Sequence, residues 1–429
     1  MKSYKAITNY VIAAFIAQGS YFILIPLIIN HFGEDVFADI ELFNVYANLL
    51  FQFFGVNICT AVTKYKYDSK SNQDYLDFSS NIFGFGILAT FFSILFSVLI
   101  ILFKPDMWKL NDQLTAILPI GVFYLFTNFW IKNYLVTLKK VSKYRNYQLL
   151  LGVLKIASIL MVILIFDWLT AFGKIITEFT VLSILSIIFA FLEKIKIKLH
   201  RFKNDIVRAL KFSSPLIIYV IINNLLNYSD QIFISNYFDK MALAIYSVGY
   251  RVGMIILIFY VAISNYFSID YYENFENKEK NKNNTMYLII VLLIFSLFMS
   301  LVSVYYIKYS TSWEGTILRQ AVKVNKIVIL SYFINSIFSI YSRELFHLGK
   351  TFKISILVSI CALINIALNF LFLENSDILT AAYTTLISYA ILGMISVFYM
   401  LKSDMENNLH VVLLFLTSTI LLTAFMFII

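Results

Sequence analysis

Long apolar runs dominate the chain, and polar residues gather in short stretches between them. The runs Ile87 to Phe103 and Met286 to Ile307 contain no charged residue. Crossing the hydrocarbon of a bilayer takes about 20 mostly apolar residues, and the backbone is satisfied there only in helices or closed barrels. A barrel would show alternating strands of about ten residues separated by turns. The pattern therefore predicts membrane-spanning helices.

The pattern predicts twelve core helices and a thirteenth at the end of the sequence. They lie at residues 10–29, 41–62, 80–103, 114–136, 148–166, 175–192, 213–236, 244–267, 285–307, 324–346, 354–373, 379–400 and 411–429. Lys2 and Lys5 precede the first segment, as in a signal peptide. Because its apolar character continues to residue 29, we interpret it as a retained helix.

Composition agrees with this pattern. The 429 residues are 60% hydrophobic and 14% charged, with a mean hydropathy of +0.79. Soluble domains carry about 25% charged residues, so much of this surface must face something other than water. Cys59 and Cys361 lie in apolar segments, and the four histidines are scattered. This predicts no disulfide framework, no metal site and no cofactor.

Lysine and arginine fall unevenly between alternate loops. With the N-terminus in the cytoplasm, the inner loops hold 22 of them and the outer loops 8. This asymmetry predicts a multi-pass membrane protein with a cytoplasmic N-terminus. The net charge of +9 is then mainly a topology signal, and no basic patch predicts nucleic-acid binding.

A basic stretch at 193–212 divides the chain into two halves. We expect an N-terminal bundle at 1–192, a cytoplasmic linker at 193–212 and a C-terminal bundle at 213–429. Within the linker, Phe202, Ile206 and Leu210 have helical spacing, which favours an interfacial helix over a solvated linker. The halves echo each other, since Asn30-His-Phe32 recurs 206 positions later as Asn236-Tyr-Phe238. An even number of helices in each half predicts parallel repeats.

Charged residues inside the predicted helices are the best candidates for function, because a central charge costs about 2.5–3.5 kcal/mol on insertion scales. They are Lys132, Lys155, Asp230, Arg251, Arg343 and Glu344. Lys155 and Arg251 lie about two turns inside, roughly 10 Å, and favour a wet cavity. Lys132 and Arg343 lie close enough to a helix end to snorkel, so both roles stay open.

The two acidic residues have two open interpretations. Asp230 and Glu344 either pair with Arg251 or Arg343, which we favour, or bind a coupling proton or sodium ion. A cationic cavity suits an anionic cargo, and arginine binds phosphate in bidentate fashion.

Small polar residues and glycines complete the candidate set. Asn223 shares a helical face with Asn227, and Asn365 shares one with Asn369, where they supply hydrogen bonds to cargo or to helix packing. Gly249 and Gly253 form a small-xxx-small pattern that we assign to packing. Motifs for nucleophilic, phosphate-binding or metalloprotease sites are absent from the sequence, which predicts a protein that is not an enzyme.

Two stretches resemble the Wzx-type O-antigen flippases of the MOP superfamily. The first is Asp230-Gln-Ile-Phe-Ile-Ser-Asn-Tyr-Phe, followed by Ala244-Ile-Tyr-Ser-Val-Gly-Tyr-Arg251. The second is Leu348-Gly-Lys-Thr, followed by Ile364-Asn365-Ile-Ala-Leu-Asn369 and Ala381-Ala-Tyr-Thr-Thr385. One departure is Glu374-Asn-Ser-Asp377, where the family has a Pro-Leu-Phe-Gly-like turn.

The resemblance implies two six-helix bundles around a central cavity. It implies alternating access that moves an undecaprenyl-pyrophosphate-linked oligosaccharide across the inner membrane for O-antigen or a related surface polysaccharide. Its partners would be that lipid-linked substrate, membrane lipids and the polysaccharide polymerase or chain-length machinery. Lys155 and Arg251, with Lys132 and Arg343, would attract the pyrophosphate; this assignment is our hypothesis, because the family motif covers only Asp230 and Arg251.

Three other classes compete with the flippase. A multidrug or metabolite exporter of the related MATE type shares the fold, although a cationic interior disfavours cationic drugs. An O-antigen polymerase typically carries a large periplasmic loop, whereas the longest predicted outer loop, Lys308 to Lys323, is short. A structural scaffold gives no reason for intramembrane charges.

Overall fold

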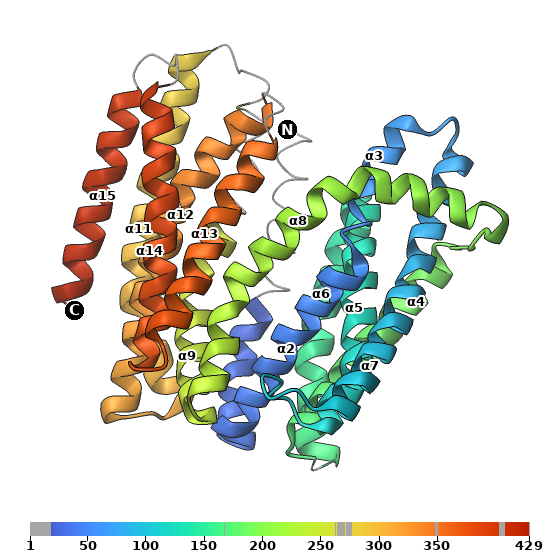
Figure 1. Ribbon diagram of the computed structural model, residues 1–429, viewed down its shortest axis with the longest axis horizontal. Helices are drawn as coiled ribbons and strands as arrows, with labels where there is room; N and C mark the ends of the chain where they lie inside the picture. The colour runs from blue at the N-terminus through green and yellow to red at the C-terminus, as the bar shows by residue number, and fades with distance from the viewer. Residues whose placement is uncertain are drawn as a thin grey trace. The chain divides into compact units, whose positions relative to one another are not determined.

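The computed structural model describes residues 19–166, 168–261, 263, 271, 277–347, 351–402 and 408–428, and their regular elements are all helices (Figure 1). The chain divides into two compact units, Met1–Tyr228 (unit 1) and Ser229–Ile429 (unit 2). The prediction of an all-α polytopic membrane protein is confirmed. Residues 10–18 of the first predicted helix and residues 348–350 of the second motif lie outside the described residues.

Unit 1 begins with a short apolar helix, Gly19–Phe32. It continues with α2 (Glu34–Gly55), α3 (Thr60–Asp68), α4 (Asn72–Phe103), α5 (Asp112–Thr137), α6 (Val141–Met161), the π-helical turn η1 (Val162–Phe166), α7 (Ala171–Leu192) and most of α8 (Leu199–Tyr237). The division between the units falls inside α8.

Unit 2 begins at Ser229, near the end of α8. It holds α9 (Lys240–Gly253), α11 (Lys278–Thr311), α12 (Gly315–His347), α13 (Thr351–Phe372), α14 (Ile378–Lys402) and α15 (Asn408–Ile428). The predicted thirteenth segment is therefore a helix.

Polar side chains fix where several helices begin. Each accepts a hydrogen bond from a backbone N–H in the first turn, which would otherwise lack a partner. The capping residues are Ser71 before α4, Asn111 before α5, Thr170 before α7, Asp239 before α9 and Asn277 before α11.

A break separates α2 from α3, within the segment 41–62 that the sequence predicts as one helix. Val56 and Asn57 have φ of 42° and 51°, a left-handed conformation that a helix cannot continue through. The two helices are bent by 42° at this point. The predicted helix is thus a broken one.

Ten described helices are long and apolar enough to cross a membrane, or eleven if α2 and α3 form one bent span. In α5 and α12, 72% of the most apolar window is buried inside the protein, whereas in α4 only 22% is. Each unit is thus built around one central helix, α5 or α12, and α4 turns its apolar surface outward, as expected for lipid contact.

Several helices begin earlier than predicted. α6 starts at Val141 instead of 148, α7 at Ala171 instead of 175, and α8 at Leu199 instead of 213. The hydropathy rule marks only the apolar part of a helix, so polar first turns escape it. The expected linker 193–212 is consequently helical from Leu199 onward.

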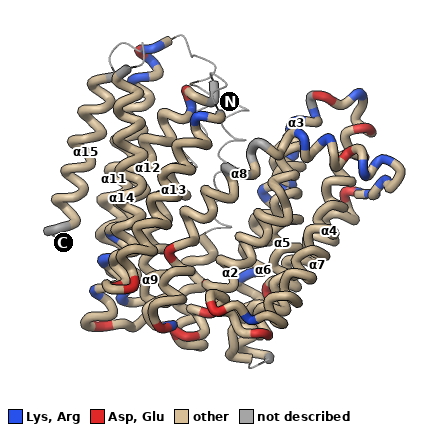
Figure 2. The backbone as a smooth tube through the Cα atoms, in the orientation of Figure 1, with Lys and Arg blue, Asp and Glu red and all other residues tan. Residues whose placement is uncertain are grey.

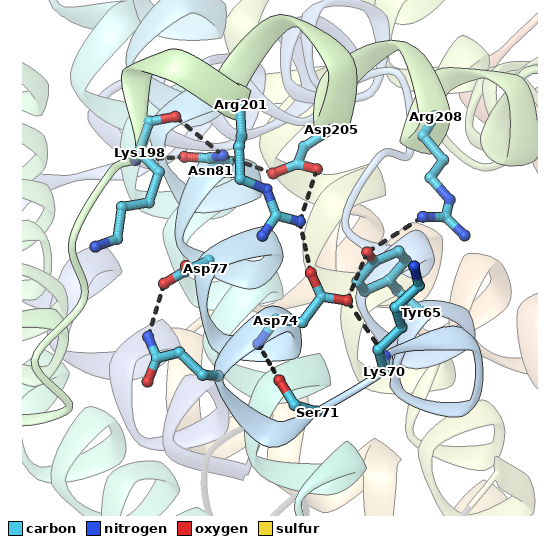
Figure 3. A network of polar contacts seen from close by, with 11 residues as sticks. Tyr65, Lys70, Ser71, Asp74, Asp77, Asn81, Lys198, Arg201, Asp205 and Arg208 are labelled. Carbon is cyan, nitrogen blue, oxygen red and sulfur yellow. Dashed lines mark hydrogen bonds and ion pairs between the residues drawn. The ribbon is translucent and has the colours of Figure 1, made fainter.

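The first turns of α8 are held to α4 by polar contacts inside unit 1 (Figure 3). Arg201 Nη2 lies 2.6 Å from Asp74 Oδ1, and this hydrogen bond raises the pKa of Arg201. Asn81 Nδ2 donates to Asp205 at 2.7 Å and Asn81 Oδ1 accepts from the Lys198 backbone N–H at 2.7 Å. The basic stretch is thus docked on unit 1.

Candidate functional site

A buried carboxylate, Asp230 of α8, is the centre of a polar cluster within unit 2. Its side chain is 1% exposed. It accepts hydrogen bonds from the Tyr246 hydroxyl of α9 at 2.7 Å, from Asn369 Nδ2 of α13 at 2.6 Å and from the Thr385 hydroxyl of α14 at 2.5 Å. Four helices therefore converge on this one side chain.

A second layer of polar groups fixes the first. Asn365 Oδ1 accepts from the Ser229 hydroxyl at 2.9 Å, and its amide donates to Thr385 at 3.2 Å. The Thr384 hydroxyl donates to Asn369 Oδ1 at 2.8 Å. Asn365 and Asn369 face the cluster from adjacent turns of α13, as their spacing predicts.

Neutral groups supply the hydrogen bonds that Asp230 accepts. Transferring an ionised carboxylate to a low-dielectric interior is costly, and these donors offset part of that cost. The ion pair with Arg251 or Arg343 that one interpretation requires is not among the described contacts of Asp230. The cluster also offers carboxylate, amide and hydroxyl oxygens within a few ångströms of each other, a donor set suited to a hard cation.

A row of buried tyrosines extends from the cluster. Tyr246 stacks on Tyr250 with ring centroids 5.7 Å apart, and the hydroxyl groups of Tyr250 and Tyr332 lie 2.7 Å apart. Tyr332 in turn contacts Tyr389 of α14 at 5.7 Å. The polar centre is thus lined by phenol groups on α9, α12 and α14.

The glycines of α9 serve packing, as predicted. A Cβ atom at Gly249 would lie 2.5 Å from the Ala321 backbone oxygen, and one at Gly253 would lie 2.9 Å from the Asn325 backbone oxygen. Both neighbours belong to α12. The two glycines allow α9 to approach α12 closely beside Tyr246 and Tyr250.

The predicted cations of unit 2 lie on two helices. Arg251, on α9, is half-buried and lies eleven residues into its helix, about 16 Å by helical rise. Arg343, on α12, is 6% exposed and lies over the Tyr271 ring at 5.6 Å. Arg343 and Glu344 line a recess of about 30 Å³ together with Lys282, room for about two water molecules.

The predicted cations of unit 1 come together. Lys132 of α5 and Lys155 of α6 are both half-buried, and they lie close enough for their charges to repel each other. Because α6 starts at Val141, Lys155 lies fourteen residues into the helix, about 21 Å by helical rise. The apolar pattern did not include the polar first turns of α6. Figure 2 shows most other charged residues gathered near helix ends.

Sequence reasoning missed two buried charged residues of unit 1. Lys174 and Glu178 of α7 form an ion pair at 2.6 Å, with side chains 3% and 8% exposed. The sequence assigns Lys174 to an outer loop, because the predicted helix begins one residue after it. The spacing of four residues between opposite charges on an apolar helix was the signal that could have found the pair.

Comparison with protein families gives a match over part of the chain. Residues 215–371 match the model of the MatE family. No curated protein matches the chain.

Solved structures extend the likeness to nearly the whole chain. The lipid II flippase MurJ in an inward closed conformation is 16% identical, with a TM-score of 0.71 over 97% of this chain and 91% of that one. An inward-facing multidrug resistance MATE family transporter of the MOP superfamily is 13% identical, with a TM-score of 0.66 over 97% and 98%. A MOP superfamily transporter from Pyrococcus furiosus Vc1, described as having a binding pocket of reverse polarity, is 15% identical, with a TM-score of 0.54 over 98% of this chain and 96% of that one. The chain therefore has the fold of these transporters.

Proposed function

We propose that this protein is a flippase that moves undecaprenyl-pyrophosphate-linked oligosaccharide units across the bacterial inner membrane by alternating access. The match to the MatE model and the fold shared with MurJ and the MATE transporters support membership of the MOP superfamily. Transport, rather than catalysis, is the activity that such a fold favours. The fold alone leaves the cargo open.

The observation that carries the choice of cargo is the pair Lys132 and Lys155. The two ammonium groups belong to membrane-spanning helices and their charges repel each other, so they favour an anionic group beside them over a further cation. A lipid-linked pyrophosphate is an anion that approaches from the membrane. A cationic drug would add to the repulsion.

Arg251 and Arg343 extend the argument to unit 2. Both belong to membrane-spanning helices, and guanidinium groups bind phosphate oxygens in pairs. We assign all four cations, Lys132, Lys155, Arg251 and Arg343, to binding of the anionic cargo.

We assign Asp230 to cation coupling. Its carboxylate is buried and accepts hydrogen bonds from the amide NH2 group of Asn369 and the hydroxyl group of Thr385, and it is the group that a proton or a sodium ion would neutralise. Binding of such a cation would neutralise the carboxylate and allow the surrounding hydroxyl groups to reorient. Because α8 belongs to both units, a change at Asp230 acts on the helix that joins them. Glu344 is assigned to pairing in its own recess.

In this proposal the N-terminus lies in the cytoplasm, and the protein lies in the inner membrane beside the polysaccharide polymerase and chain-length machinery that use its product. The excess of lysine and arginine in alternate loops supports this orientation.

A MATE-like exporter of drugs or metabolites is the second candidate. It is favoured by the match of residues 215–371 to the MatE model. An exporter and a flippase differ in cargo, so the experiment must follow both.

The experiment is deletion of the gene in its native host, followed by analysis of surface glycan and of lipid extracts for undecaprenyl-linked oligosaccharide. A flippase predicts loss of surface polysaccharide with complete, unpolymerised lipid-linked units on the cytoplasmic face. Single repeat units at the surface would indicate a polymerase. Unchanged glycan with altered drug sensitivity would overturn the flippase in favour of the exporter.

A further inference from the structure

The two units have the same internal arrangement of helices. In unit 1, α5 packs against α2, α4 and α7, and in unit 2, α12 packs against α9, α11 and α14. This relates α2 to α9 and α7 to α14, in agreement with the parallel repeat in the sequence. Each residue of the Asp230 cluster therefore has a counterpart position in unit 1.

The counterpart of Thr385 is an acidic residue. Thr385 lies seven positions after Ile378, the first residue of α14, and Glu178 lies seven positions after Ala171, the first residue of α7. By the same registration, the counterpart of Ala381 is Lys174.

A second acidic residue of unit 1, Glu41, lies on α2, the helix that corresponds to α9 of unit 2. Ser247, next to Tyr246, lies seven positions after Lys240, and Glu41 lies seven positions after Glu34. Glu41 is fully buried and accepts a hydrogen bond from the Tyr21 hydroxyl. Unit 1 thus carries carboxylates at two positions where unit 2 carries hydroxyl groups, while Asp230 itself corresponds to Leu24 by the 206-residue offset of the repeat.

An internal ammonium group neutralises one of these carboxylates. Lys174 Nζ lies 2.6 Å from Glu178 Oε2, one helical turn away, and both side chains are almost completely buried. The next residue, Phe179, meets the rings of Phe43 and Tyr124 edge-on at 5.4 and 5.5 Å. In such apolar surroundings, loss of one partner of an ion pair leaves a strongly disfavoured charge.

We propose that Lys174 is a built-in counter-ion that closes the unit 1 counterpart of the Asp230 site to exchangeable cations. Its ammonium group neutralises Glu178, as a sodium ion or a proton neutralises Asp230. The two units are then chemically asymmetric, and the exchangeable coupling cation binds in unit 2. This inference rests on the proposed cation-coupling role of Asp230.

The inference predicts what removal of the ammonium group will do. In Lys174→Met the Glu178 carboxylate stays buried without its counter-ion, so it must take up a proton or a sodium ion. The variant then gains a cation dependence that the native unit 1 lacks. In Lys174→Met/Glu178→Gln there is no carboxylate to neutralise, and in Lys174→Arg the internal cation is kept.

The test is the thermal unfolding midpoint of the purified full-length protein in detergent, with sodium chloride against choline chloride at equal ionic strength. All variants carry Asp230→Asn as well, so that unit 2 contributes no cation response. At pH 8 in choline, Lys174→Met should have the lowest midpoint and recover on addition of sodium or on acidification. Lys174→Met/Glu178→Gln and Lys174→Arg should show neither recovery. A Lys174→Met midpoint that responds to neither cation would overturn the inference.

A second measurement does not depend on the folding of Lys174→Met. With Lys174 intact, Asp230→Asn alone should remove the sodium response of the midpoint completely. A remaining response that Glu178→Gln abolishes would mean that unit 1 already takes an exchangeable cation, and would overturn the inference. A native protein without any response that depends on Asp230 would instead refute the proposed coupling site, while the gain of response in Lys174→Met would still support the built-in counter-ion.

Discussion

A single carboxylate, Asp230, accepts three hydrogen bonds from three other helices. Asp230→Asn keeps the shape of the side chain but replaces an acceptor with a donor that faces Tyr246 and Thr385. We expect loss of surface polysaccharide in a complemented deletion strain, because the neutral amide cannot bind or release a cation. The unpaired donors should also lower the free energy of unfolding by about 1–3 kcal/mol.

The matched control for this change is Asp77→Asn, an aspartate of α4 that accepts a hydrogen bond from Gln73 on the preceding turn. It should leave surface polysaccharide unchanged. Asp230→Asn protein that reaches the membrane in normal amount and restores normal polysaccharide would contradict the coupling role.

Glu193 gives a prediction of pH dependence at a site beyond the end of α7. Burial of its carboxyl disfavours the ionised form, but hydrogen bonds from Lys140 and Lys143 at 2.6 and 2.5 Å outweigh burial and hold its pKa below the ordinary value. A lowered pKa in the folded state means that the stabilisation is present above the ordinary pKa and disappears as the pH falls through the folded-state pKa.

The measurement is the unfolding midpoint of the native protein and of Glu193→Gln as a function of pH. At pH 7 the variant should be less stable by on the order of 1 kcal/mol, since Lys143 is exposed and solvent weakens its contribution. The difference should shrink as the pH falls below the ordinary pKa of a glutamate and approach zero below the folded-state pKa. A difference that is constant with pH would show that the carboxylate charge does not contribute.

The sequence predicts residues of this site only partly. Asp230 stands out as a charge in an apolar segment, and Asn365 and Asn369 share a face by spacing alone. Their mutual contact does not follow from any local pattern, because Asp230 and its partners Asn369 and Thr385 are 139 and 155 positions apart. Lys174 was misplaced for a related reason, since its charge ends the apolar run although Thr170 caps the helix before it.

At the scale of helices, close contact between α9 and α12 depends on Gly249. Gly249→Val would place its Cβ 2.5 Å from the Ala321 backbone oxygen and 2.9 Å from Val324 Cβ. Backbone cannot yield as a flexible side chain does, so the helices must separate. We expect destabilisation of at least about 1–3 kcal/mol.

The control is Gly19→Ala, because a Cβ at Gly19 meets no atom of the described residues within 4 Å and alanine favours a helix. Unfolding midpoints of the two variants in detergent test the difference. Equal midpoints for Gly249→Val and the native protein would mean that the two helices are not in contact at this position.

Helix boundaries show where sequence reasoning ends. Apolar length locates the spanning part of a helix, but capping residues and polar first turns decide where it begins, as at α6 and α8. Neither residue at the break, Val56 or Asn57, is a proline or a glycine, although Gly55 precedes them. Valine rarely adopts a left-handed backbone, so the local sequence does not predict the break at Val56.

At the scale of the whole molecule, the sign of charge in the interior separates the two candidate functions. Lys132 and Lys155 of unit 1 repel each other, so both ammonium groups attract an anionic cargo and repel a cationic one. A charge-assisted hydrogen bond contributes about 1.5–3 kcal/mol, and each 1.4 kcal/mol is tenfold in affinity. Lys132→Met/Lys155→Met should therefore reduce transport of lipid-linked oligosaccharide about tenfold or more.

The same double variant would affect an exporter of cationic drugs in the opposite direction, since removing the repulsion favours a cationic cargo. Surface polysaccharide and efflux of a cationic dye are measured in one complemented deletion strain, with Lys104→Met/Lys109→Met as a control that removes two exposed charges. Loss of polysaccharide without gain of efflux supports the flippase, because the control removes equal charge at the surface. Normal polysaccharide with increased dye efflux would contradict it, and the cationic pair would then be a barrier to drugs rather than a binding site for pyrophosphate.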